Sequence, residues 1–244
     1  MKIIETNNLI KRFDGVHAVD RLSIGIEKGQ ITGIVGPNGS GKTTLIDLLS
    51  GVLEIDGGEI IIDGTKKISR LLPHQVSLYG ITRTFQNVRL FEQMTVLDNI
   101  LVAETERNVF GSFFEGHAQC HYKTAEEVLR KVGLLENKNR LAVSLSYGQR
   151  KLLEIARVLA MKSRIYLFDE PFAGLFPEMR KIISSIIQEL KRENKTVILV
   201  EHDMGLIREL CEHILVMDEG KLLAQGDPGS VLGKREVIEA YLGR

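Results

Sequence analysis

The stretch GPNGSGKT, residues 36–43, has the residue types and the spacing of a phosphate-binding loop. It fits the pattern Gly-x-x-x-x-Gly-Lys-Ser/Thr, follows the apolar run ITGIV and opens a run with helical spacing. Gly36, Gly39 and Gly41 allow a backbone whose successive N–H groups point at phosphate oxygens. The N-terminus of the following helix adds a partial positive charge. The stretch therefore predicts a binding site for a nucleoside triphosphate.

Two side chains of this loop have chemistry of their own. Lys42 is expected to reach the outer phosphates as a point charge, and Thr43 offers a hydroxyl to Mg²⁺. A flexible glycine-rich turn with an incidental lysine is the alternative, and the intact pattern with its flanking strand and helix argues against it. We expect the nucleotide to contact the loop and the first helical residues, namely Gly36, Pro37, Asn38, Gly39, Ser40, Gly41, Lys42, Thr43 and Thr44.

The run IYLFDE, residues 165–170, is an apolar strand that ends in two carboxylates. An apolar strand ending in Asp presents a carboxylate beside Mg²⁺, which is the role expected for Asp169. Glu170 follows at the edge of the sheet, where it could orient or deprotonate an attacking water. Two solvated acids in a loop are the alternative, which a complete phosphate loop in the same chain makes less favourable.

A second strand of this design is VILVEHD, residues 197–203. It places His202 at a carboxyl end of the same sheet, where ligands of such folds bind. A single histidine is more often structural than catalytic, but its place at a strand end beside the other two motifs favours a role at the nucleotide.

The elements that must position these residues alternate between strands and helices. Strand-like runs fill the first 30 residues and recur at 57–64, whereas helical spacing dominates from about 90 to 160. This order predicts an α/β fold of the P-loop NTPase type: a mostly parallel sheet flanked by helices, an N-terminal antiparallel β part and an inserted helical subdomain. We expect one domain over 1–244, with a catalytic core at 1–88 and 158–230, a helical subdomain at 89–157 and a helical tail at 231–244.

Composition excludes several classes of function. The 244 residues carry 32 basic and 32 acidic side chains, so a general nucleic-acid or anionic-membrane footprint is not supported. Two cysteines give no disulfide framework and fit a reducing compartment. No window approaches 18 uninterrupted apolar residues, and the N-terminus is not a signal peptide. A cytosolic chain is expected, and any work at a membrane needs a partner.

The run LSYGQRKLLEIARVLA, residues 145–160, resembles the signature helix of ABC-type ATPases. TFQ (84–86) precedes it and the Asp-Glu and EHD strands follow it, so the resemblance covers nearly the whole chain. It implies that Gln86 senses Mg²⁺ and the γ-phosphate, so Mg²⁺ would be held by Thr43, Gln86 and Asp169. It also implies that Phe13 stacks on adenine, that Glu170 is the general base and that His202 contacts the γ-phosphate.

The resemblance also implies that ATP is bound between two subunits. Each signature would then contact the nucleotide of the other subunit through Ser146, Tyr147, Gly148 and Gln149. Tyr147 stands where glycine is commonest in the family. Ser146 fits an anion site at a helix N-terminus and equally fits a plain helix cap, and both interpretations can hold together.

A closer resemblance is to the ATP-binding subunits of bacterial branched-chain amino acid importers. It is carried by GITRTFQNVRLFEQMTVLDNILVA (80–103), LSYGQ, EHDM and EAYLG (239–243). It implies a homodimer or a heterodimer with a related ATPase, peripheral on the inner face of the cell membrane. The membrane subunits would dock near residues 86–122, fed by a periplasmic binding protein. Four aromatic residues there belong either to that interface or to the subdomain core, namely Phe91, Phe110, Phe113 and Phe114.

Three other functions are alternatives to an importer ATPase. An ATPase of an envelope-lipid or export system shares DEPFAG, but TRTFQ with SYGQ argues against it. A soluble ABC ATPase acting on DNA, ribosomes or iron–sulfur assembly is a second alternative. The DNA-repair kind needs a coiled-coil insertion, and the ribosomal kind needs two phosphate loops. The sequence of this chain has one phosphate loop and no heptad run. A small kinase or GTPase would lack the signature helix.

Two further features stand out. His117, Cys120 and His121 offer metal ligands within five residues but lack a fourth ligand, which is weak support for zinc. Phe176 stands where the family usually has Asp or Asn that caps the next helix and reaches across the dimer. Phe176 cannot accept a hydrogen bond, whereas Pro177 suits the first helical position. We therefore expect an active ATPase whose communication between the two sites is altered.

Overall fold

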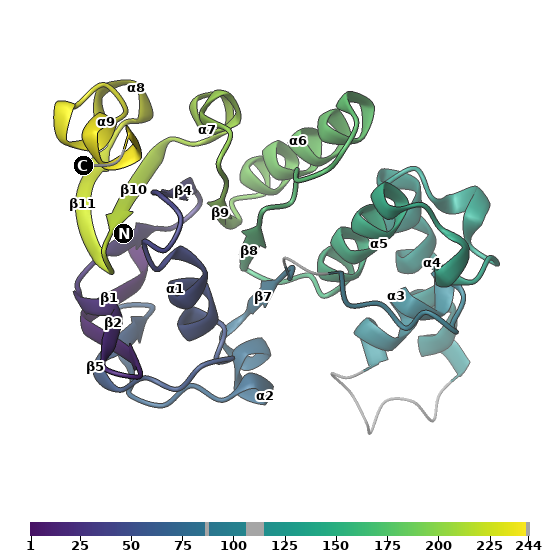
Figure 1. Cartoon of the computed structure of the whole chain (residues 1–244). Helices are drawn as coiled ribbons and strands as arrows, with labels where there is room; N and C mark the ends of the chain where they lie inside the picture. Colours follow the sequence, from purple (N-terminus) through teal and green to yellow (C-terminus); the bar gives the residue numbers. More distant parts are fainter. Residues whose placement is uncertain (86–87, 106–114, 243–244) are drawn as a thin grey trace. The chain divides into compact units, whose positions relative to one another are not determined.

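The computed structural model describes residues 1–85, 88–105 and 115–242, with backbone alone for 105 and 115–120; Figure 1 labels its elements. The described chain divides into two compact units. The first comprises Met1–Arg83, Arg164–Glu170 and Ile187–Arg244. The second comprises Thr84–Ser163 and Pro171–Ile186.

A six-stranded sheet with the order β11-β10-β4-β9-β8-β7 forms the centre of the first unit. All neighbours pair in parallel except β11, which runs antiparallel to β10. The strands are β4 (Ile31–Val35), β7 (Ile81–Arg83), β8 (Ile165–Asp169), β9 (Thr196–Val200), β10 (His213–Asp218) and β11 (Lys221–Gly226). A parallel sheet gathers the carboxyl ends of its strands at one edge, where the predicted motifs lie.

The apolar runs at β4, β8 and β9 form buried strands, as the sequence predicted. Every residue of β4, β8 and β9 is buried, and the strands are runs of mostly β-branched or aromatic residues without alternation. The pairing brings Ile34 of β4 and Asp169 of β8 opposite Val200 of β9 from its two sides. The position of Asp169 at the end of β8 is therefore fixed by the pairing of β8 with the buried strand β9, which in turn pairs with β4.

An antiparallel sheet precedes this one in the sequence, in the order β2-β1-β5-β6 with β3 also paired to β1. Its first hairpin turns at Asp14 and Gly15, with φ of 46° and 86°, as the Asp-Gly pair predicts for a two-residue turn. The strands are β1 (Lys2–Phe13), β2 (Val16–Leu22), β3 (Gly25–Glu27), β5 (Gly57–Ile62) and β6 (Lys66–Ile68).

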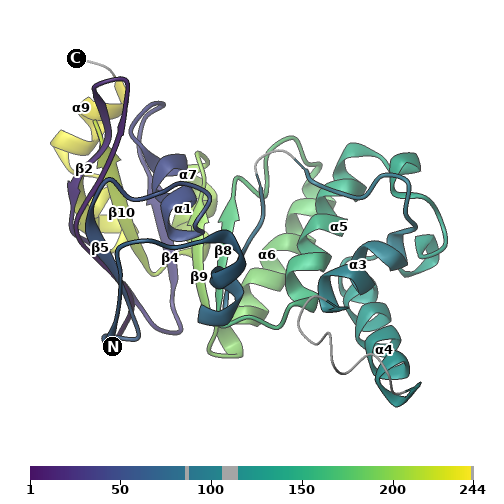
Figure 2. The ribbon, with the colours of Figure 1, turned by 90° about the horizontal axis from the view of Figure 1, so that it is seen from below.

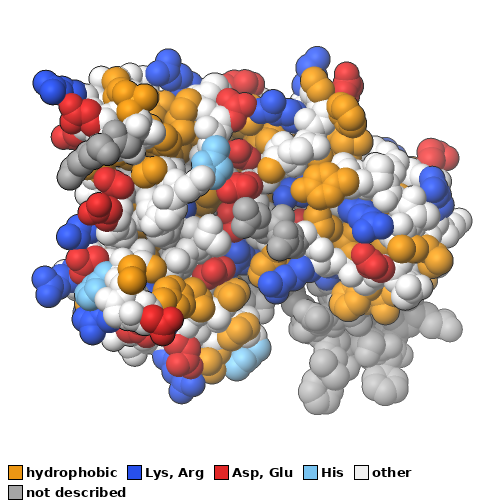
Figure 3. Space-filling model, in the orientation of Figure 1, with side chains coloured by type: hydrophobic (Ala, Val, Ile, Leu, Met, Phe, Trp, Pro, Cys, Tyr) orange, Lys and Arg blue, Asp and Glu red, His pale blue; other side chains and the backbone are white. Residues whose placement is uncertain are grey.

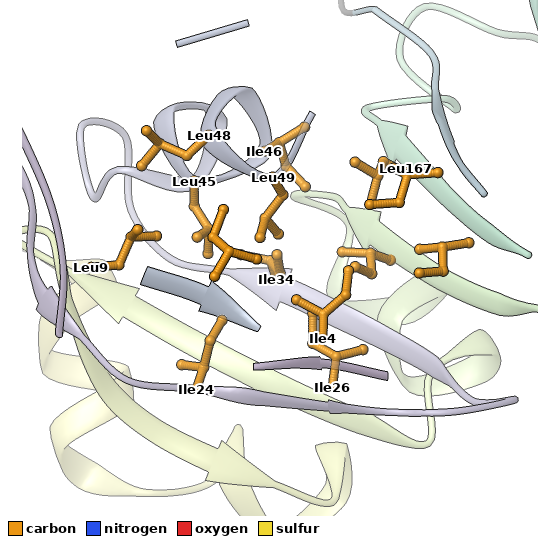
Figure 4. Packing of buried hydrophobic residues seen from close by; sticks show 14 of the residues in the cluster. Ile4, Leu9, Ile24, Ile26, Ile34, Leu45, Ile46, Leu48, Leu49 and Leu167 are labelled. Carbon is orange, nitrogen blue, oxygen red and sulfur yellow. The ribbon is translucent and has the colours of Figure 1, made fainter. Parts of the chain in front are cut away.

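The core of the first unit lies around helix α1 (Lys42–Leu49). Figure 4 shows Leu45, Ile46 and Leu49 of α1 near Ile34 of β4, and Ile4 of β1 lies in the same cluster. All five side chains are fully buried. Because interiors are packed to crystal-like density, this contact fixes the direction of α1 and hence of the loop that precedes it.

Short helices complete the first unit. Figures 1 and 2 show α8 and α9 beside β10 and β11 and α1 against the sheet near β4. The bounds are α2 (Pro73–Val76), the 3₁₀ turn Ser77–Tyr79, α7 (Met204–Leu210), α8 (Pro228–Val231) and α9 (Arg235–Leu242).

The second unit is helical. Figure 2 shows α3 (Val96–Thr105), α4 (Glu115–Lys131) and α5 (Tyr147–Ala160) packed together, with 3₁₀ turns at Leu135–Asn137 and Ala142–Ser144. Helix α6 (Pro177–Arg192) begins in this unit and ends in the first.

The expected α/β fold with an antiparallel β part and an inserted helical subdomain is confirmed. The run RNVFGSFFEGHAQCHYK, residues 107–123, is rich in Gly, Phe and His and predicts a loop or short helices. This prediction is wrong for residues 115–123, which belong to the 17-residue helix α4. Gly, His and Cys hide the helical pattern there, but extending a helix by further turns costs little once it is nucleated.

In the described part of the chain, no helix is both long and apolar enough to cross a membrane. On the face shown in Figure 3, acidic and basic side chains are interspersed, as the balanced charge predicts.

Candidate functional site

The phosphate loop joins the end of β4 to the start of α1. Its three glycines all have positive φ, with 150° at Gly36, 80° at Gly39 and 96° at Gly41. A Cβ at Gly41 would lie 2.2 Å from the carbonyl oxygen of Ala18, so a side chain there is excluded by backbone as well as by φ. The predicted need for glycine in this loop is confirmed at Gly41 by a specific neighbour.

The N-terminus of α1 has no side-chain cap among the described residues and no acidic residue in its first turn. Other helices are capped: Asp203 accepts from two N–H groups of α7, and Asp227 accepts from one of α8. The first N–H groups of a helix lack intrahelical partners and carry partial positive charge. At α1 these groups suit an anion such as a phosphate.

Lys42 is the first residue of α1, and its side chain folds back over the loop. Nζ donates to the carbonyl oxygens of Gly36 at 2.8 Å and Pro37 at 2.9 Å. Burial lowers the pKa of the Lys42 ammonium, and the charges of Glu170 and Asp169 raise it. The ammonium is thus held at the loop by neutral acceptors, which phosphate oxygens could replace. Thr43, in the same turn, is exposed.

Asp169 ends β8 and is almost fully buried. Its Oδ2 accepts a hydrogen bond from Arg83 Nη2 at 3.2 Å, and Arg83 Nη1 lies 2.5 Å from Asp47 Oδ1. Arg83 Nη1 also donates to Ser50 Oγ at 2.8 Å. Arg83 is the last residue of β7, so a single guanidinium connects β7, β8 and α1. Nothing in the sequence marks Arg83 as a site residue except its position just before TFQ.

Glu170 and His202 face each other from the ends of neighbouring parallel strands. His202 Nε2 lies 2.9 Å from Glu170 Oε1, and the Glu170 N–H donates to the Val200 carbonyl at 3.0 Å. Glu170 has φ of 48°, a left-handed conformation that glutamate rarely adopts. Such strained residues cluster at active sites. The two residues expected to act on the γ-phosphate are therefore brought together.

Phe13 closes the first hairpin, and 44% of its surface is exposed. The ammonium of Lys11 lies 5.5 Å from the ring centroid. An exposed ring at the tip of a hairpin can stack on a planar base, and the neighbouring cation adds to the positive charge near it.

Tyr241 of α9 interacts with the phosphate loop from a distant part of the sequence. Desolvation, the larger cause, raises the pKa of the Tyr241 hydroxyl to about 12, while the nearby backbone N–H of Gly36 lowers it. EAYLG was noticed in the sequence only as part of a resemblance, and nothing there indicated this contact.

The signature residues lie at the start of α5 in the second unit. Ser146 Oγ accepts the Gln149 N–H at 3.3 Å, and Gln149 Oε1 accepts the Ser146 N–H at 3.0 Å. This reciprocal capping box confirms that Ser146 caps the helix. Tyr147 is exposed over 53% of its surface, and its Cε1 would lie 3.1 Å from a Cβ placed on Gly174. Gly148 follows in the first turn.

Phe176 immediately precedes α6, and 74% of its surface is exposed. Pro177 is the first residue of α6, as predicted. The Phe176 carbonyl accepts the Arg180 N–H at 3.1 Å, so the backbone of Phe176 takes part in the helix start although its side chain cannot. An apolar ring this exposed lies where a capping side chain was expected.

Some expected site residues lie outside the described part of the chain. These are Gln86, residues 106–114 of the expected docking segment with Phe110, Phe113 and Phe114, and the side chains of His117 and Cys120. His121 is described, and its Nδ1 lies 3.1 Å from Glu104 Oε2. Among the described residues, no group of three or more His, Cys, Asp or Glu side chains could hold a metal ion.

The model of the ABC transporter family matches residues 19–173. The chain is 39% identical over 251 residues to the high-affinity branched-chain amino acid transport ATP-binding protein BraF of Pseudomonas aeruginosa, covering 99% of this chain and 98% of that one. It is 37% identical over 250 residues to LivG, of the same description, from Salmonella typhimurium, covering 99% and 98%.

Solved structures agree with the sequence comparisons. A nucleotide-free ATP-binding cassette from an ABC transporter superposes with a TM-score of 0.88 at 33% identity, covering 100% of both chains. A chain from a dimeric, post-hydrolysis ATP-binding cassette bound to ADP and phosphate superposes with a TM-score of 0.81 at 26% identity, covering 93% of this chain and 99% of that one. The family match covers more than half of the chain, and the relatives cover nearly all of it. The chain belongs to the ABC transporter family and is an ATP hydrolase of its cassette type.

Proposed function

We propose that this chain is the motor subunit of a membrane importer for branched-chain or related amino acids. The observation that carries the ATPase part is the gathering of four groups at one edge of the parallel sheet: Lys42, Asp169, Glu170 and His202. The substrate class rests on the near-full-length similarity to BraF and LivG.

In the proposed reaction, ATP binds first and water attacks its γ-phosphate. Phe13 stacks on the adenine, and the N–H groups of the loop 36–44 hold the phosphates. Lys42 exchanges the carbonyls of Gly36 and Pro37 for phosphate oxygens. Glu170 orients the water and takes its proton, and His202 contacts the γ-phosphate.

The donor set at the site fits Mg²⁺. The Thr43 hydroxyl and the Asp169 carboxylate are hard oxygen ligands, which Mg²⁺ prefers, and the ion would take its other ligands from phosphates and water. We propose Thr43, Asp169 and Gln86 as the protein ligands. When bound, the ion neutralises charge that develops on the phosphates.

A second subunit completes the site in this proposal. Ser146, Tyr147, Gly148 and Gln149 contact the nucleotide bound by the other subunit. The N-terminus of α5 has no acidic residue in its first turn and carries a partial positive charge, which supports this role because it suits an anion. The similarity to a cassette solved as a dimer is further support. The partner is either a second copy of this chain or a related ATPase.

We also propose that the pair sits on the inner face of the cell membrane and drives two integral-membrane subunits, which receive substrate from a periplasmic binding protein. These subunits would dock near residues 86–122. Phe91 supports such an interface because 44% of its surface is exposed.

Purification of the chain from its host membrane in mild detergent tests this proposal. We expect two polytopic membrane proteins to copurify, and ATP hydrolysis by the complex to rise when a branched-chain amino acid and its binding protein are added. Recovery with ribosomes or DNA alone would contradict a transport role. Copurification of polytopic subunits without any response to amino acids would contradict the substrate class alone.

A further inference from the structure

Glu154 is a buried carboxylate that the proposed reaction does not use. It lies on α5, eight residues after Ser146, and only 3% of its surface is exposed. Lys151, one turn earlier, is also buried. Glutamate is almost never buried without partners, because removing a carboxylate from water is costly.

The partners of Glu154 are backbone groups of the segment that contains Gln86. Its Oε1 accepts the Phe85 N–H at 3.0 Å. The Arg89 N–H lies close enough to the same carboxyl group to lower its pKa. Phe85 directly precedes Gln86, and Arg89 follows it by three residues. Glu154 thus holds the backbone at Phe85, on the N-terminal side of Gln86.

Arg157, one turn further along α5, strengthens this connection. Its Nη1 donates to the Arg89 carbonyl oxygen, and its guanidinium lies 5.2 Å from the centroid of the Phe91 ring. The Arg89 guanidinium in turn lies 4.0 Å from the centroid of the Phe85 ring. The Arg89 carbonyl group is therefore held by α5.

The acceptor oxygens of Glu154 suit this task. On balance the pKa of Glu154 is raised: burial raises it, and the Phe85 N–H, the charge of Lys151, the Arg89 N–H and the charge of Arg157 lower it by less. A carboxyl oxygen can accept the Phe85 N–H whether the group is ionised or protonated. An apolar residue would pack here without desolvation cost but would leave the Phe85 N–H without this acceptor.

We propose that Glu154 is a positioning residue for ATP hydrolysis, which ties the backbone at Phe85 to the helix that begins at Ser146. Through this hydrogen bond, the residue directly before Gln86 moves together with the helix that carries the signature residues. The proposal deepens the proposed function, since it assumes that Gln86 acts on the nucleotide. Glu154 itself touches neither nucleotide nor metal.

The test compares Glu154→Ala with Glu154→Gln and with a matched core variant. Leu153→Ala removes a fully buried side chain of the same helix. Because the leucine side chain is apolar, it makes no hydrogen bond to Phe85 or Arg89. ATP affinity, kcat and thermal unfolding are measured on the purified chain, together with hydrogen exchange of peptides covering residues 84–92.

We expect Glu154→Ala to lower kcat about tenfold or more with little change in ATP affinity, because the phosphate loop is untouched. Exchange in 84–92 should rise. Glu154→Gln should recover much of kcat, since its amide oxygen can still accept the Phe85 N–H. Leu153→Ala should lose stability while keeping kcat and slow exchange in 84–92.

Three results would overturn the proposal. The first is wild-type kcat in Glu154→Ala, and the second is an equal loss of kcat in Leu153→Ala at matched stability. The third is Glu154→Gln as inactive as Glu154→Ala. If the wild-type chain itself does not hydrolyse ATP, the proposed function fails instead, so the two failures are distinguishable.

Discussion

The imidazole Nε2 of His202 lies 2.9 Å from Oε1 of Glu170. The two residues are 32 positions apart and meet because β8 and β9 are adjacent parallel strands that end in register. Each follows a fully buried strand, so the distance between them is set by the packed core rather than by a loop. His202 is thus placed to orient the carboxylate proposed as the general base.

This contact predicts that Glu170 and His202 act as a unit. His202→Ala should lower kcat by about 10²-fold, because general-base catalysis contributes 10²–10⁴-fold and Glu170 would lose its orienting partner. The double variant with Glu170→Gln should be hardly slower than Glu170→Gln alone, since residues acting together are not additive. Steady-state phosphate release from all four proteins checks this, and multiplied effects would contradict it.

Arg83 is predicted to matter for stability. Its side chain and that of Asp169 are 7% and 1% exposed, so Arg83→Gln leaves a buried carboxylate without its guanidinium partner. Breaking such a pair costs about 3–5 kcal/mol of unfolding free energy. Urea denaturation measures this change.

The matched control for Arg83 is Arg164, which forms a more exposed ion pair with Asp63 at 3.0 Å. Arg164→Gln should cost at most about 1 kcal/mol, because exposed ion pairs contribute little. Equal losses of unfolding free energy in Arg83→Gln and Arg164→Gln would contradict a larger contribution of the buried Arg83–Asp169 pair to stability.

Phe176→Asn is predicted to change communication between the two ATP sites. Asparagine would supply the missing cap of α6, worth about 0.5–2 kcal/mol of stability, and a polar group for the second subunit. The cooperativity or the basal rate of ATP hydrolysis should change while ATP affinity stays the same. Phe176→Ala, which removes the ring without adding a polar group, is the control. If Phe176→Asn has unchanged kinetics, Phe176 is only a tolerated packing residue.

Cys211 is predicted to be unreactive in the folded protein. Burial, Glu212 and Glu201 raise the pKa of its thiol to about 12. The thiolate, which is the form that reacts with alkylating reagents, is therefore scarce at neutral pH. In a Cys120→Ala background, where Cys211 is the remaining cysteine, iodoacetamide should label the chain only after unfolding. Rapid labelling of the native protein would contradict the burial of Cys211.

The raised pKa of the Cys211 thiol also predicts that the stability of the folded chain depends on pH. Because burial raises its pKa, the folded state keeps the Cys211 proton up to about pH 12, whereas the unfolded thiol loses it near its ordinary pKa of 9.0. The stability that Cys211 contributes is therefore full below pH 9 and is lost as pH rises towards 12, by up to about 1.4 kcal/mol per pH unit. Cys211→Ala should reduce this alkaline slope in urea titrations. An unchanged slope would exclude Cys211 as its source.

Local patterns in the sequence predicted much of the fold. The runs at β4, β8 and β9 are mostly apolar and lead into polar motifs, which indicates buried parallel strands. The Asp14-Gly15 turn and the cap at Ser146 were also predictable, because each depends on neighbours within a few residues. β7 was missed because three residues are too few to show a period.

The contacts that the sequence did not reveal join residues far apart in the chain. Arg83 meets Asp169, and Tyr241 meets Gly36, through tertiary packing alone. A carboxylate on an amphipathic helix usually faces solvent, so the sequence does not indicate that Glu154 is buried. The structure shows its burial and the hydrogen bond that it accepts from the Phe85 N–H.

The most direct test of ATP hydrolysis at this site is phosphate release from Mg²⁺–ATP by the wild-type chain and by Glu170→Gln. We predict that Glu170→Gln binds ATP with the affinity of the wild type, releases phosphate at least about 10²-fold more slowly and sediments as a dimer with ATP. Normal turnover by Glu170→Gln would contradict the role assigned to Glu170.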